Sequence, residues 1–197
     1  MQCQHCHHNN GVGSEFEGLF GRPARPKPAR NQVDAETPLL YGKEHEFLVP
    51  DIHRERGMHC IDCHGSNDIK GEPPSSLPHS NVETRCEDCH GTHQKAPKEF
   101  LLLESDPTSK PIFDWLKLNP NLVKKIGNGD PILVNSKGRP MPHIKREKKQ
   151  WLLFSKVTGK RHVLPILKDI KPPAAHQVPA HMNQVECAAC HARWSAG

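Results

Sequence analysis

The stretch Gly57-Met58-His59-Cys60-Ile61-Asp62-Cys63-His64-Gly65 contains the pentapeptide Cys-x-x-Cys-His, which occurs four times in the chain, at residues 3–7, 60–64, 86–90 and 187–191. Together the copies use all eight cysteines: Cys3, Cys6, Cys60, Cys63, Cys86, Cys89, Cys187 and Cys190. A histidine follows each second cysteine: His7, His64, His90 and His191. A spacing repeated without exception indicates one chemistry at four equivalent sites.

That spacing is typical of covalent c-type haem attachment. Each thiol adds across one vinyl group of the porphyrin, and the adjacent histidine coordinates the iron from one face. Zinc ribbons also contain Cys-x-x-Cys but do not require the trailing histidine. A thioredoxin-type motif would occur once, within a βαβ pattern that this sequence lacks. We therefore expect four covalent haem c groups, with the four trailing histidines as proximal ligands.

The composition predicts a thin side-chain core. Apolar residues make up 35% of the chain and aromatic residues 5%, while 19 prolines and 14 glycines interrupt regular structure. We expect haem burial to replace much of the missing core, so that the chain without haem is largely unfolded. The fold class expected is a multihaem cytochrome c of low regular secondary structure. It would be mostly coil, with short helices wrapped around haems and a small antiparallel β-hairpin insert.

Three regions are expected along the chain. Residues 1–93 would bind haems one to three and contain a proline-rich linker near residues 22–30. Residues 94–180 lack cysteine and would form an insert with a short helix within 113–125 and hairpin turns at 135–138 and 158–159. Residues 181–197 would carry the fourth haem motif.

An internal repeat indicates the distal iron ligands. A shift from Cys60 to Cys86 also superposes His53 on His79 and Asp62 on Asp88. A looser copy places a histidine six positions before Cys187. The predicted distal ligands are His53, His79 and His181, with His45 as the fourth. His8, His93 and His176 are reserve candidates.

Three segments resemble the large periplasmic or cell-surface multihaem c-type cytochromes of metal- and sulfur-respiring bacteria. They are residues 51–64, 85–92 and 186–194, and the motif-bearing segments make up about half of the chain. The resemblance implies low-potential haems with two histidine ligands that relay electrons to terminal acceptors or partners. In that family further motifs often follow a stretch similar to the His-Ala-Arg-Trp at 191–194, so we expect this chain to be part of a longer protein.

The histidine content favours an electron carrier. Of 15 histidines, four are proximal, which leaves eleven for four distal positions. A haem that only transfers electrons is usually held on both faces, whereas a catalytic haem leaves one position open. The function expected is an electron-transfer relay through four haems with mainly bis-histidine ligation. The alternatives are a multihaem reductase with one open-site haem and a subunit of a haem filament or conduit.

Charge and hydropathy limit the partners. The side chains carry a formal charge of +5, and four ferric haems with ionised propionates would lower it to about +1 by counting ionised groups. We expect redox partner proteins or other multihaem cytochromes, no nucleic acid, and no membrane span in this chain. Haem c attachment predicts a periplasmic, extracellular or cell-surface location. Because Cys3 leaves no room for a signal, we expect an export signal upstream.

Overall fold

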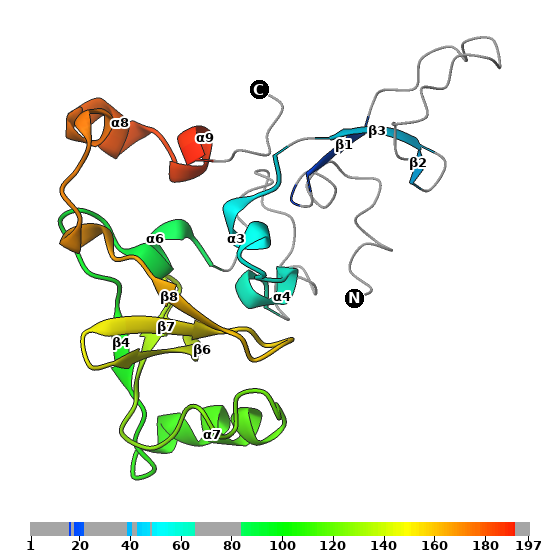
Figure 1. Ribbon diagram of the computed structural model, residues 1–197. Coiled ribbons are helices and arrows are strands. Elements are labelled where there is room, and N and C mark those ends of the chain that lie inside the picture. The colour runs from blue at the N-terminus through cyan, green and yellow to red at the C-terminus, as the bar shows by residue number, and fades with distance from the viewer. Residues whose placement is uncertain are drawn as a thin grey trace. The chain divides into compact units, whose positions relative to one another are not determined.

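A computed structural model describes residues 16, 18–21, 39–40, 43–47, 49–65 and 84–191 (Figure 1). The chain divides into two compact units, Met1–Met58 with Glu186–Gly197 and His59–Val185. The first motif and His79 lie outside the described residues. The other three motifs lie within them, the second and third in the second unit and the fourth in the first unit.

The described part of the first unit contains a small antiparallel sheet and two short helices. The sheet has the strand order β1-β3-β2, with strands β1 (Leu19–Gly21), β2 (Leu39–Leu40) and β3 (Lys43–Phe47). Helix α3 (Ile52–Glu55) follows, and the Asp51 side chain caps it by accepting the backbone N–H of His53. Helix α9 (Cys187–His191) carries the fourth motif.

The second unit is built on a five-stranded antiparallel sheet of strand order β4-β5-β6-β7-β8. The strands are β4 (Glu99–Leu101), β5 (Pro131–Val134), β6 (Pro140–Glu147), β7 (Gln150–Phe154) and β8 (Arg161–Leu164). Helices α4 (Cys60–Cys63) and α6 (Cys86–His90) precede the sheet, and α7 (Lys110–Lys117) lies between β4 and β5. The remaining elements are the 3₁₀ helices η2 (Pro107–Ser109), η3 (Leu167–Asp169) and η4 (Ala174–Gln177), and helix α8 (Pro179–Gln184).

Strand β7 is buried on both faces of the sheet. Trp151, Leu152, Leu153 and Phe154 are all buried, as expected for a continuous apolar run with side chains alternating between two covered faces. In the pairing with β6, Leu152 lies opposite Lys145. Because all four apolar side chains are buried, this strand is shielded from solvent on both faces of the sheet.

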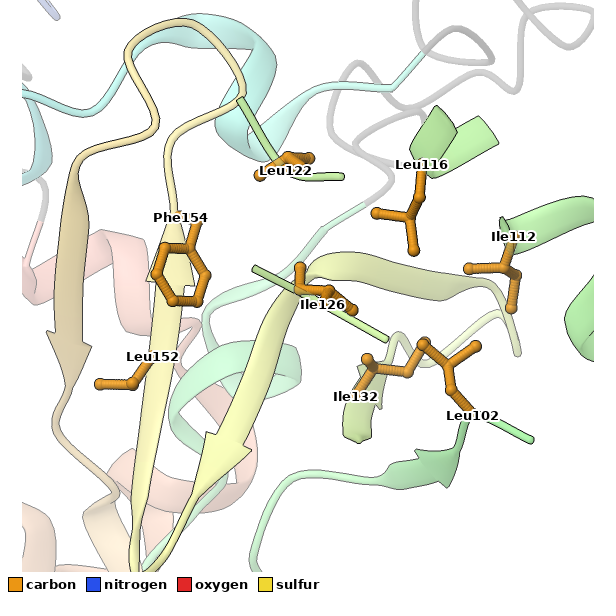
Figure 2. Close-up of a cluster of buried hydrophobic side chains, with 8 residues drawn as sticks. All are labelled: Leu102, Ile112, Leu116, Leu122, Ile126, Ile132, Leu152 and Phe154. Carbon is orange, nitrogen blue, oxygen red and sulfur yellow. The ribbon is translucent and has the colours of Figure 1, made fainter. Parts of the chain in front are cut away.

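Helix α7 covers one face of this sheet (Figures 1 and 2). Ile112 and Leu116 are one turn apart and both are buried, whereas Asp114 and Lys117 form an exposed ion pair on the other side of the helix. The core shared by helix and sheet consists of Leu102, Ile112, Leu116, Leu122, Ile126, Ile132, Leu152 and Phe154. This part of the chain has a side-chain core of its own.

The expected fold class is therefore wrong. The described residues form a five-stranded antiparallel sheet with a few short helices, and not a chain of coil and short helices wrapped around haems. They also contain no group of three or more metal-binding side chains. The expectation failed because it used the average composition of the whole chain. The apolar residues of the second unit pack into one cluster, which that average does not show. The expectation that haem burial must replace the core is wrong for this unit.

Candidate functional site

Each described motif forms a short helix of about one turn. The second motif forms α4 with His64 as the C-cap, the third forms α6, and the fourth forms α9. Cysteines three positions apart lie on the same face of a helix, so each pair of thiols faces the same side. None of the six described cysteines is in a disulfide. Paired thiols on one face, followed directly by a histidine, are the donor set that a covalently attached haem needs.

Asp62, between the cysteines of the second motif, joins its helix to the sheet. Its Oδ2 accepts the backbone N–H of His59 at 2.9 Å, and its Oδ1 accepts the backbone N–H of Lys156 at 2.7 Å. Lys156 lies in the turn after β7. With 2% of its surface exposed, Asp62 is a buried carboxylate that uses both oxygens as acceptors. Such bonds are what make a buried charge tolerable.

Asp88 makes the equivalent contacts in the third motif. Its Oδ2 accepts the backbone N–H of Arg85 at 2.9 Å, and its Oδ1 accepts the backbone N–H of Ser136 at 2.7 Å. Ser136 lies in the turn between β5 and β6. Asp88 is 6% exposed. The aspartates that the internal repeat superposes therefore have the same two roles.

Two side chains of the sheet region hold the end of α4. His143, on β6, donates Nε2–H to the Asp62 carbonyl at 2.8 Å, and Lys156 Nζ donates to the Ile61 carbonyl at 2.5 Å. These carbonyls belong to the last turn of the helix, which has no helical donors for them. Burial lowers the pKa of His143 well below its ordinary value, and the Lys156 ammonium lowers it further. His143 is therefore neutral at pH 7.

The second cysteine of the third motif is a buried thiol. Burial raises the pKa of the Cys89 thiol far above its ordinary value, and the charges that Cys63, Asp88 and Cys86 can carry raise it further. Cys89 is consequently a neutral thiol at physiological pH. Cys63, whose charge contributes to this shift, belongs to the second motif and lies 26 residues earlier in the sequence.

The proximal histidine of the third motif has a defined orientation. His90 Nδ1 lies 2.8 Å from the Pro165 carbonyl oxygen, and since a carbonyl only accepts, Nδ1 must carry the proton. This tautomer places the lone pair on Nε2, the nitrogen that can coordinate iron. Ligating histidines typically donate their other N–H to a carbonyl or carboxylate in this way. The residues of the third motif therefore fit a haem.

The predicted distal ligand His53 has the same kind of support. Its Nδ1 donates to Asp51 Oδ1 at 2.8 Å, and the same oxygen accepts the His53 backbone N–H at 2.8 Å. The Asp51 carboxylate orients the ring and again leaves the lone pair on Nε2. The His53 side chain is 43% exposed, so a ligand can reach it. Sequence reasoning had selected His53 from the repeat without identifying Asp51.

The remaining predicted ligands are described only in part. Cys3, Cys6, His7 and His79 lie outside the described residues, and for His45 in β3 and His181 in α8 only the backbone is described. Cys187, Cys190 and His191 are exposed on α9. The reserve candidates His93 and His176 contact each other, with Nε2 and Nδ1 3.0 Å apart.

No protein-family model matches the chain, and neither a curated protein nor a solved structure shows significant similarity to it. Within the described residues, no helix is long and apolar enough to cross a membrane. The absence there of a cluster of three metal-binding side chains does not conflict with haem attachment, because a haem draws only its one or two axial ligands from the protein.

Proposed function

We propose that this chain is an electron-transfer relay that carries haem c covalently at its four Cys-x-x-Cys-His motifs. When bound, the haem supplies a one-electron iron couple. The chain's own residues attach it through paired thiols, provide the proximal histidine, and control burial. The observation that carries the proposal is the third motif, where paired cysteines on α6 are followed by His90 oriented by the Pro165 carbonyl.

His53 supports ligation on the second face of a haem. An imidazole whose Nδ1–H is bound to a carboxylate such as Asp51 is a strong iron ligand, and two histidine ligands leave no open position for a substrate. This favours electron transfer over reduction of a bound substrate. Redox proteins outside the cytoplasm are the partners proposed, because haem c is attached there.

The test is to express the full chain with an export signal beside a cytochrome c maturation system. The intact mass after acid-acetone extraction should exceed that of the polypeptide by about four haems, because thioether-linked haem resists extraction. Cysteine-to-alanine substitution of one motif should remove one haem. Adding carbon monoxide or cyanide to the holoprotein should leave the visible spectrum largely unchanged. Recovery of zinc without haem would contradict the proposal.

A further inference from the structure

The two turns that receive α4 and α6 are built alike. Each contains a buried polar residue, then a residue whose backbone N–H binds a motif aspartate, and then a glycine with a positive φ angle. These are Asn135, Ser136 and Gly138 (φ 78°) in the β5–β6 turn, and Ser155, Lys156 and Gly159 (φ 67°) in the β7–β8 turn. Positive φ suits glycine and allows the tight turn. The two turns therefore provide equivalent points of attachment for α6 and α4.

Strand order places these turns together. The strands β5, β6, β7 and β8 are consecutive neighbours and antiparallel, so the first and third of their three turns lie at the same end of the sheet. Two strand spacings separate the two hairpins, which is about 10 Å. Because α4 bonds to one of these turns and α6 to the other, both helices dock at the same end of the sheet.

The aspartates do more than cap their helices. A cap needs one acceptor oxygen, and each aspartate gives Oδ2 to its own helix. The other oxygen accepts from the sheet. Asparagine has only one acceptor oxygen, and its NH₂ group would face a backbone N–H. A carboxylate is therefore required at both positions if both bonds are to form.

We propose that Asp62 and Asp88 are positioning residues that lock the second and third motif helices onto one end of the sheet. As a rigid pair, the helices would set the orientation of two haems relative to each other. The inference rests on the proposed function, since it assumes that both motifs carry haem. It adds a role for the sheet, which is to fix the geometry of an electron-sharing pair.

The experiment compares the exported holoprotein with the variants Asp62→Asn and Asp88→Asn. Amide hydrogen exchange should accelerate at least about tenfold in the turn whose bond is lost, at Lys156 for Asp62→Asn and at Ser136 for Asp88→Asn. Haem content should remain at that of the wild type. The magnetic coupling between the paired ferric haems, measured by electron paramagnetic resonance, should weaken in both variants. A purely structural role would leave the coupling unchanged.

Two further variants make the result decisive. Lys156→Met alters no motif residue but removes the Nζ–H bond to the Ile61 carbonyl, so it should loosen α4 and weaken the coupling even if an aspartate variant fails to fold. Asp130→Asn is the matched control, because Asp130 Oδ2 accepts the Gly127 N–H and the Lys145 ammonium within the same unit, and both partners lie outside the motifs. It should leave the coupling intact. Wild-type protein without haem would refute the proposed function, whereas fully loaded variants with unchanged coupling would refute this inference alone.

Discussion

His143 should make the folded protein sensitive to acid. Its imidazole is buried, with 3% of its surface exposed, and burial holds its pKa well below the ordinary value of 6.5. In the unfolded chain the same group takes up a proton near pH 6.5. Below that pH the unfolded state binds more protons than the folded state, so the free energy of unfolding falls as pH falls. Above pH 6.5 this contribution is fully present.

The size of the effect follows from the linkage relation. For one group the slope approaches about 1.4 kcal/mol per pH unit below pH 6.5, until the pKa of the folded state is reached. The free energy of unfolding of small proteins is typically about 5–15 kcal/mol. The change in this free energy when the pH falls by one unit is therefore measurable. His143→Gln removes the titration but keeps an amide N–H that can donate to the Asp62 carbonyl. In this variant the free energy of unfolding should therefore fall less steeply as the pH drops below 6.5.

The assay is urea unfolding of the full-length chain produced without haem, between pH 5.0 and 7.5. Tryptophan fluorescence reports unfolding, because Trp151 is buried in β7 and becomes exposed to water when the sheet unfolds. The control is His176→Gln, which removes a partly exposed histidine from η4 and leaves His143 in place, so it should keep the wild-type slope. Equal slopes in wild type and His143→Gln would show that His143 does not control the acid response.

Two further predictions concern the core and the ligand. Leu152→Ala should lower the free energy of unfolding by about 2–5 kcal/mol, because Leu152 is 1% exposed in the shared core; Val163→Ala, at a side chain that is 50% exposed, should change it by no more than about 0.5 kcal/mol in urea unfolding. Asp51→Asn should raise the reduction potential of the haem bound by His53, because an amide makes the imidazole a weaker donor than a carboxylate does. The control is Asp106→Asn, which changes an aspartate that caps η2 in the second unit. If a redox titration of Asp51→Asn gave the same potentials as wild type and this control, Asp51 would not have that role.

Local sequence was sufficient to predict two turns and one helix. Strands β5 and β6 meet at residues 135–138, where the sequence predicted a hairpin turn, and β7 and β8 meet around the predicted turn at 158–159. The helix predicted within residues 113–125 is α7, but it begins earlier and ends at Lys117. Pro111 is compatible with the first turn of a helix, which explains the earlier start. Turn and cap preferences depend on neighbouring residues, so they can be read locally.

The sequence identified Asp62 and Asp88 as equivalent residues but not the contacts that they make. Their superposition in the internal repeat singled them out in the sequence, but nothing there connected them to Lys156 and Ser136. Those partners are 94 and 48 residues away in the chain. The repeat places the two aspartates at equivalent positions, and only their bonding partners show what they do there.

The sequence by itself determined the four motifs, because the thiol spacing and the trailing histidine are properties of five consecutive residues. Only the tertiary structure decided that the second and third motifs dock at the same end of one sheet. That placement depends on the order of strands in the sheet, which brings two distant turns to one end, and on an apolar core against which the sheet packs. Both arise from contacts between residues far apart in the chain, which average composition and local spacing do not record.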